Sequence, residues 1–244
     1  MLMGAKAEMS MSEQAQVAFA KQHKFEKGTS RAARVTRIGK RIAAVADRDD
    51  FEWEFHVVIE KTQNAMSLPG GKVYFFTGLL DLLGKDDAHL AAIMGHEVAH
   101  AILRHGSEKV SHNILAISST AIIGIILSAR TNGEIDSRQV ADGGMQLANW
   151  VFLLPYSRTL ESEADHVGAI LMAKAGYDPR KAITVWEKLE KAQKDLPKPP
   201  VFLSTHPPHA DRIAYLQEVM PEIMQYYKST SNHEHRRKKL NSVQ

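Results

Sequence analysis

The segment His96-Glu97-Val98-Ala99-His100 constrains this chain more than any other stretch of its sequence. Residues four positions apart lie one turn apart on the same face of a helix, so both imidazoles can reach one metal ion without distorting the backbone. Glu97 is rotated by about 100° from His96. It can therefore border the open coordination position of the metal and accept a proton there. The pattern predicts half of a zinc site with a general base beside it.

The residues around this motif favour a metal site. The alternative is an ordinary amphipathic helix with surface histidines, in a chain that has 12 histidines. Asp86 and Asp87 suit the start of a helix. The apolar residues that follow recur at helical spacing and are Leu90, Ile93, Met94, Val98, Ala101 and Ile102. Three ionisable groups in such a helix are costly unless something pairs them, and a metal ion would do so.

The two histidines do not complete the site, because a catalytic zinc ion usually has three protein ligands and one open position. The chain contains no cysteine, so the third ligand has to be a histidine or a carboxylate. The metzincin pattern requires glycine and histidine at the positions that Leu103 and Gly106 occupy, which excludes that class of site.

The segment Leu160–His166 is the better source of a third ligand. It lies near the start of a helix expected over 157–175, for which Ser157 marks the first turn. Glu161 and Asp165 share one face of this helix, so one carboxylate could bind zinc while the other orients a ligand histidine. An acidic turn that merely complements the helix dipole is the alternative.

Together these two motifs resemble those of the M48 family of zinc metallopeptidases, and within it the Oma1-like branch with its bacterial periplasmic BepA- and LoiP-like members. The likeness covers roughly residues 10 to 228. The further stretches that carry it are Asn64-Ala65, Pro69-Gly70-Gly71, Phe75 with Thr77-Gly78-Leu79, Met94-Gly95, Leu154-Pro155-Tyr156-Ser157-Arg158 and Leu203-Ser204-Thr205-His206-Pro207-Pro208.

The resemblance implies that three side chains bind one zinc ion, namely His96, His100 and Glu161. Glu97 would then be the general base of the reaction. Asp165 would stand behind the ligands and orient one of them.

His206 and Arg212 complete the expected site. Pro207 disfavours a helical conformation at His206, which is therefore expected on a loop before a helix over Ala210–Met220. A loop histidine without a role is the alternative. The resemblance implies that His206 approaches the zinc, where it stabilises the oxyanion or sits on the metal as a latch in a resting form. It also implies that Arg212 holds this loop or the carboxylates behind the metal.

The periodicity predicts an α+β fold that is mostly helical, with a small antiparallel sheet beside the His96–His100 helix, which fits the gluzincin type of metalloprotease. The expected strands are 51–61, 65–68 and 72–76, and the expected helices are 12–25, 30–46, 79–83, 86–104, 107–129, 138–153, 157–175, 179–194 and 209–227. An extended substrate could add to an exposed edge strand, with Asn64 and Ala65 as substrate-binding residues. A simple turn residue is the alternative for Asn64.

A single peptidase domain is expected over 1–228, followed by a basic and disordered tail over 229–244. The net charge of +3 owes much to this tail. No aromatic residues interleave its basic run, so no nucleic-acid partner is predicted. The apolar stretch Ile114–Ala129 is shorter than the roughly 20 residues that span a bilayer. This favours a buried helix, with peripheral membrane contact as the alternative.

These observations predict a zinc-dependent endopeptidase with one Zn²⁺ per chain, which hydrolyses misfolded or envelope proteins by metal-activated water. The alternative is a quality-control protein that binds polypeptides as a chaperone does, with a latched zinc site. A membrane-embedded CAAX-type protease would need several apolar spans of about 20 residues, which the sequence lacks. The resemblance implies a periplasmic or membrane-associated location in the bacterial cell envelope. The segment Met1–Lys6 lacks the apolar core of a signal peptide, so a targeting segment is expected to have been trimmed.

Overall fold

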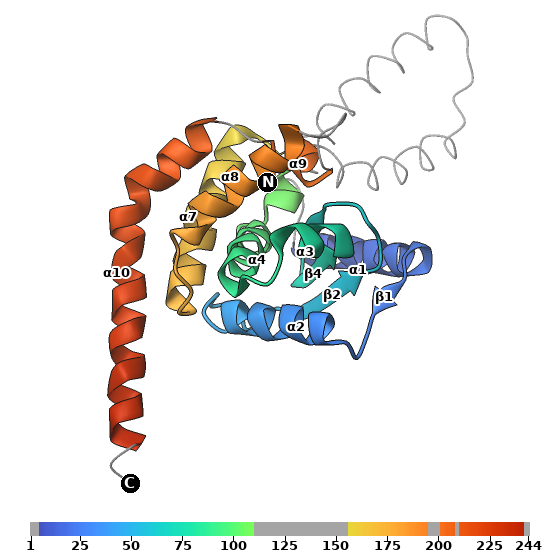
Figure 1. The fold of residues 1–244 in the computed structure, drawn as a ribbon. Coiled ribbons are helices and arrows are strands. Elements are labelled where there is room, and N and C mark those ends of the chain that lie inside the picture. Colours follow the sequence, from blue (N-terminus) through green and yellow to red (C-terminus); the bar gives the residue numbers. More distant parts are fainter. Residues whose placement is uncertain (1–4, 110–155, 195–200, 208–209, 242–244) are drawn as a thin grey trace, which may run out of the picture.

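The computed structural model describes residues 5–109, 156–194, 201–207 and 210–241 (Figure 1). The stretch Ile114–Ala129 and the helix expected over 138–153 lie outside the described residues. The expected helix over 107–129 is described only at its start.

The α+β fold is confirmed, with helices making up most of the described chain. The elements are α1 Ala5–Gln22, β1 Phe25–Glu26, α2 Ser30–Ala43, β2 Glu54–Val58, β3 Ala65–Leu68, β4 Lys72–Phe76, α3 Thr77–Leu83, α4 Asp87–Ile102, α7 Arg158–Lys174, α8 Lys181–Lys194, α9 Val201–Thr205 and α10 Ala210–Asn241. The short elements β1 and α9 were not predicted. Helix α10 runs 14 residues past the expected end at residue 227, into the range assigned to the tail.

The sheet is mixed, which corrects the expected antiparallel sheet. Its strand order is β1-β2-β4-β3, and β2 and β4 are parallel, with Val57 opposite Phe75. The turn Pro69–Gly71 makes β3 and β4 an antiparallel hairpin. Strand β4 lies between β2 and β3, parallel to the first and antiparallel to the second. Alternation of side chains predicts a strand but does not specify its neighbour, and for that reason the prediction was wrong.

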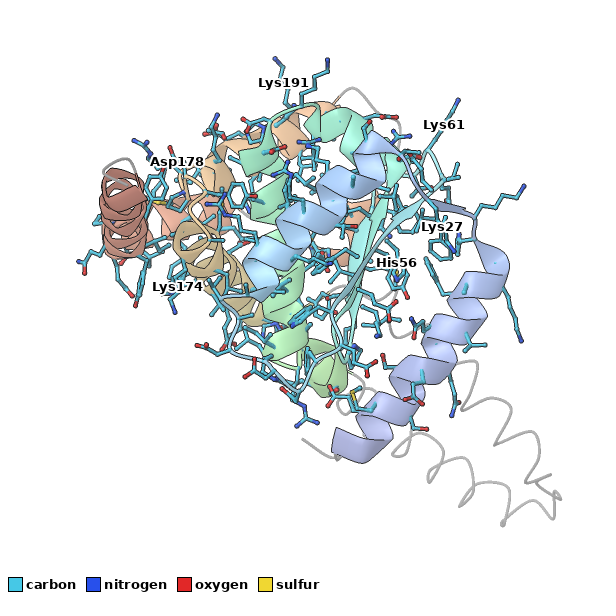
Figure 2. The ribbon with its side chains drawn as sticks, turned by 90° about the horizontal axis from the view of Figure 1, so that it is seen from below. Lys27, His56, Lys61, Lys174, Asp178 and Lys191 are labelled. Carbon is cyan, nitrogen blue, oxygen red and sulfur yellow. The ribbon has the colours of Figure 1, made fainter. Side chains whose placement is uncertain are left out.

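The central strand β4 is covered on both faces, because its side chains alternate between two apolar clusters. Val73 and Phe75 pack into the main core with α2 and α4, whereas Tyr74 and Phe76 pack with Phe19 of α1. Figure 2 shows the sheet nearly edge-on between α1 on one side and α2 with α4 on the other. The outer strand β3 contacts α4, so the sheet edge lies beside the helix of the histidine motif.

Helices α4 and α7 pack against each other at the centre of the fold (Figure 1). Asp86 caps α4 by accepting from Ala88 N at 2.9 Å, and Ser157 caps α7 by accepting from Leu160 N at 3.4 Å. The helices touch through two glycines. A Cβ on Gly95 would lie 2.5 Å from Gly168 O, and a Cβ on Gly168 would lie 2.7 Å from His96 N.

This contact predicts that Gly168→Ala separates the helices and destabilises the protein by about 1–3 kcal/mol, although alanine favours helix formation. Gly106→Ala is the matched control, because a Cβ there would meet no atom of the described residues within 4 Å. The control should be neutral or slightly stabilising. Urea denaturation of both variants measures the difference, and equal unfolding free energies would contradict the close approach.

Candidate metal centre

Four side chains from three separate segments converge at one buried point. His96 and His100 come from α4, Glu161 comes from α7, and His206 directly follows α9. Their candidate ligand atoms all lie within 4.8 Å of one another. The three residues predicted as metal ligands are thus brought together, and His206 joins them.

The closest distances within this cluster are those expected around a shared cation. His96 Nε2 lies 3.0 Å from His100 Nε2 and 3.1 Å from His206 Nδ1. Glu161 Oε1 lies 2.9 Å from His206 Nδ1 and 3.3 Å from His100 Nε2. None of the four residues is more than 2% exposed. Three ring nitrogens and a carboxylate that face one another in a buried site form a donor set that a divalent cation would satisfy.

The outer face of His96 supports the same interpretation. Its Nδ1 lies 3.0 Å from Asp165 Oδ1. An ionised carboxylate only accepts, so this arrangement assigns the proton of His96 to Nδ1 and leaves Nε2 free to bind a cation. Asp165 therefore lies behind His96, the histidine that was predicted to be a metal ligand.

The pKa shifts of His100 and Glu161 suit metal binding, which needs neutral histidines and an ionised carboxylate, whereas the shift of His96 opposes it. Burial holds the pKa of His100 well below its usual value. Burial raises the pKa of Glu161, but the neighbouring His206, His100 and Arg212 outweigh it and hold that pKa well below the usual value. Burial lowers the pKa of His96, but Asp165 and Glu161 outweigh it, so this pKa is raised. A metal would have to displace the proton from His96 as the pH falls.

Arg212 of α10 links two of these segments, α7 and the chain after α9, from behind. Its Nε and Nη2 donate to the two carboxylate oxygens of Asp165 at 2.7 and 2.8 Å. Its Nη1 donates to the Pro207 carbonyl at 3.1 Å and lies 2.7 Å from Glu161 Oε2. Arg212 thus holds both the carboxylates and the chain just after His206, which were the two roles that the resemblance implied.

Glu97 lines a small, partly open cavity beside the cluster. Its Oε1 is buried, has no hydrogen-bond partner among the described residues, and lies 3.4 Å from His206 Nε2. The cavity has a volume of about 30 Å³ and is lined by Asn64, Ala65, Met66, Ser67, Glu97, Tyr156, Thr205 and His206. The predicted base and the predicted substrate-binding residues therefore border one space, which has room for water but not for a peptide.

Two aromatic residues at the cluster were given no role by the sequence analysis. The Tyr156 ring stacks on the rings of His100 and His206, with centres 4.1 and 5.3 Å apart. The Trp186 ring meets His96 edge-on at 5.5 Å. Tyr156 stands in a stretch that carries the family resemblance, which was a usable signal, but nothing around Trp186 in the sequence indicates its position.

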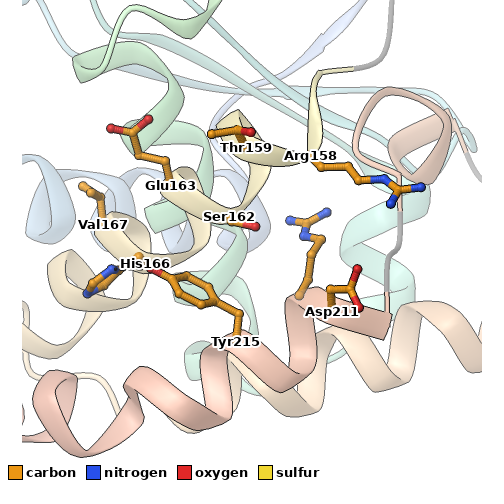
Figure 3. Close-up of a pocket in the computed structure, with 9 residues that line it drawn as sticks. Arg158, Thr159, Ser162, Glu163, His166, Val167, Asp211 and Tyr215 are labelled. Carbon is orange, nitrogen blue, oxygen red and sulfur yellow. Dashed lines mark hydrogen bonds between the residues drawn. The ribbon is translucent and has the colours of Figure 1, made fainter.

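A larger cavity of about 720 Å³ lies between α7 and the start of α10 (Figure 3). Its lining residues are Arg158, Thr159, Ser162, Glu163, His166, Val167, Asp211, Arg212 and Tyr215. It contains neither Glu97 nor any of the four cluster residues, so it is separate from the candidate metal centre. Arg212 borders this cavity and contacts Glu161 of the cluster.

No helix in the described part of the chain is long and apolar enough to cross a bilayer. The stretch Ile114–Ala129, for which the sequence left peripheral membrane contact open, lies outside that part.

Comparisons with known proteins agree with the motifs. The mitochondrial metalloendopeptidase OMA1 of Schizosaccharomyces pombe is 39% identical over 188 residues, which cover 77% of this chain and 52% of that protein. The human OMA1 metalloendopeptidase is 36% identical over 177 residues, covering 70% of this chain and 33% of that protein. A putative beta-barrel assembly-enhancing protease of Vibrio cholerae is 28% identical over 186 residues, covering 75% of this chain and 38% of that protein.

This chain therefore spans about half or less of the length of these relatives. The model of peptidase family M48 matches residues 29–220, a range that holds every residue of the cluster together with Glu97, Asp165 and Arg212. With its motifs joined at one buried centre and this match over most of its length, the chain belongs to peptidase family M48.

Proposed function

We propose that this chain is a zinc-dependent endopeptidase. The observation that carries the proposal is the convergence of His96, His100 and Glu161 beside Glu97. Two imidazoles and a carboxylate, without any cysteine, are a typical ligand set for a catalytic Zn²⁺. When bound there, zinc supplies Lewis-acid activation of water and of the scissile carbonyl.

The protein's own groups would position the reactants and move the proton. Glu97 accepts a proton from the attacking water and delivers it to the leaving amine nitrogen. A substrate in extended conformation adds to β3, which in the described chain pairs only with β4. Asn64 Oδ1 is buried and has no partner among the described residues, so it is available to accept a backbone N–H of the substrate.

We further propose that the centre rests in a latched form, with His206 as a fourth ligand. Its Nδ1 lies as close to Glu161 and His96 as the metal ligands lie to one another. The neighbouring cavity of about 30 Å³ cannot hold a peptide. Displacement of His206 would open a coordination position and enlarge this cavity. Once displaced from the metal, His206 would be free to donate a hydrogen bond to the oxyanion. Its role as a latch is therefore compatible with its role as an oxyanion donor.

The names of the relatives suggest substrates and a location for this chain. Relatives are named as a mitochondrial metalloendopeptidase and as a beta-barrel assembly-enhancing protease. We propose that this chain acts on misfolded or envelope polypeptides in the bacterial cell envelope, through a single domain over 1–228. The chaperone-like alternative is supported by the latched geometry. It predicts a metal-loaded chain that binds unfolded casein without cleaving it.

Glu97→Gln should abolish nearly all casein hydrolysis, by at least about 100-fold, because the amide cannot accept the proton. Zinc content should stay unchanged, since Glu97 is not a ligand in this assignment. Hydrolysis is followed by peptide release with and without a chelator, and zinc by elemental analysis. Chelator-sensitive hydrolysis that persists in the variant would remove Glu97 from this role.

His206→Ala should increase peptide turnover, because it removes the latch. The increase should be about tenfold if about 10% of wild-type molecules are open. The double variant His206→Ala with Glu97→Gln is the control and should be inactive. Unchanged turnover would refute the latch. A strong decrease would assign His206 to stabilisation of the oxyanion instead.

Arg212→Met should destabilise the protein by about 3–5 kcal/mol at neutral pH, because it leaves Asp165 and Glu161 buried without their cation. Burial raises the pKa of Asp165, but Arg212 and His96 outweigh it and lower that pKa. The destabilisation should therefore be complete above pH ~4, the pKa of an aspartate in the unfolded chain. It should fade as the pH falls through the lower pKa that Asp165 has in the folded protein.

Arg180→Met is the matched control for this variant, because Arg180 pairs with Asp178 on the surface. Urea denaturation at neutral and acidic pH measures both variants. Equal unfolding free energies for the two would refute the anchoring role of Arg212.

A further inference from the structure

We propose that His105 is a positioning residue, which together with Glu163 orients the ligand His100. The inference rests on the proposed metal site. His105 Nδ1 lies 2.9 Å from His100 Nδ1, the ring nitrogen that points away from the cluster. His105 Nε2 lies 3.4 Å from Glu163 Oε2. Three residues thus form a line that starts at the surface of α7 and ends at the cluster.

One arrangement of protons satisfies this whole line. The Glu163 carboxylate at 3.4 Å can only accept, so we place the proton of His105 on Nε2, which leaves a free lone pair at Nδ1. His100 Nδ1 then donates to that lone pair. Its Nε2 is left unprotonated and faces His96 and Glu161, as a metal ligand requires. In this assignment His105 fixes both the tautomer and the ring orientation of His100.

The two ligand histidines of α4 therefore have separate supports. His96 is held by the carboxylate of Asp165, whereas His100 is held by a neutral imidazole. His105 is only 1% exposed and Asp165 only 4%, so water cannot replace either support.

The backbone supports a dedicated placement of His105. On an uninterrupted helix, His105 would lie about 140° around the axis from His100 and could not reach its ring. Helix α4 instead ends at Ile102, and Arg104 adopts a left-handed conformation with φ of 60°. This conformation is uncommon for a residue other than glycine and persists only where its surroundings hold it.

The surroundings that hold this turn are provided by α1. Glu8, which is 5% exposed, pairs with the Arg104 guanidinium and accepts a hydrogen bond from Ser107. The helix resumes at His105. The turn thus brings His105 back beneath His100, and a partly buried ion pair with a distant helix fixes the turn.

The test measures zinc affinity of the full-length chain by competition with a chromophoric chelator. His105→Leu should weaken zinc binding by about 10–100-fold, because the loss of an outer hydrogen bond to a ligand has effects of that size. His105→Gln keeps an acceptor oxygen and should recover part of the affinity. In Co²⁺-loaded protein, the visible absorption spectrum should change in His105→Leu and return toward wild type in His105→Gln.

His166→Leu is the matched control, because this histidine of α7 bonds Tyr215 away from the cluster. Its zinc affinity should stay within about twofold of wild type. Glu163→Ala changes a half-exposed side chain, so it is the second test variant if His105→Leu does not fold. It should weaken zinc binding several-fold, by less than the loss of His105 itself.

Wild-type zinc affinity in His105→Leu, or in Glu163→Ala where His105→Leu fails to fold, would overturn the inference. So would a His105→Gln variant that binds no better than His105→Leu. The proposed function is judged separately, by chelator-sensitive casein hydrolysis in the wild-type chain. A wild-type chain that binds no zinc would overturn both.

Discussion

The close contact between α4 and α7 is the constraint on which the rest of the structure depends. Gly95 and Gly168 let the two backbones approach to a distance that any side chain at these positions would prevent. Glu161 is carried by the same helix as Gly168, two turns earlier, and His96 immediately follows Gly95. The glycine contact therefore sets the spacing between the histidine pair and the carboxylate. The mixed sheet contributes at one edge, where β3 lies against α4.

The pairing of buried ionisable groups is the second constraint on this structure. Ionisable groups placed in an apolar interior cost stability unless each has a partner. Here Arg212 contacts Asp165 and Glu161, Asp165 lies at His96, and His105 lies at His100. These partners orient the inner ring nitrogens and keep the carboxylates ionised. The same arrangement that makes burial tolerable thus prepares the centre for a cation, and His206 closes it on the side of the predicted substrate strand.

The sequence singled out the residues that the structure brings together because their chemistry and spacing are local. A pair of histidines one turn apart has the same geometry in every helix, and the stretch from Glu161 to Asp165 repeats that logic on a second helix. His105 was missed for the opposite reason. Its contact with His100 depends on a left-handed residue at Arg104, which helical periodicity does not reveal. Trp186 was missed because only the packing of α8 brings its ring to His96.

The sequence alone thus determined most of the longer described helices, the strands β3 and β4, and the residues that could bind a metal. These follow from side-chain period, capping and ligand chemistry within short windows. Only the tertiary structure decided that β4 runs parallel to β2, how closely His206 approaches the cluster, and that His105 lies against His100. Each of these depends on contacts between segments far apart in the chain. Such contacts are set by how whole helices and strands pack, which no local pattern encodes.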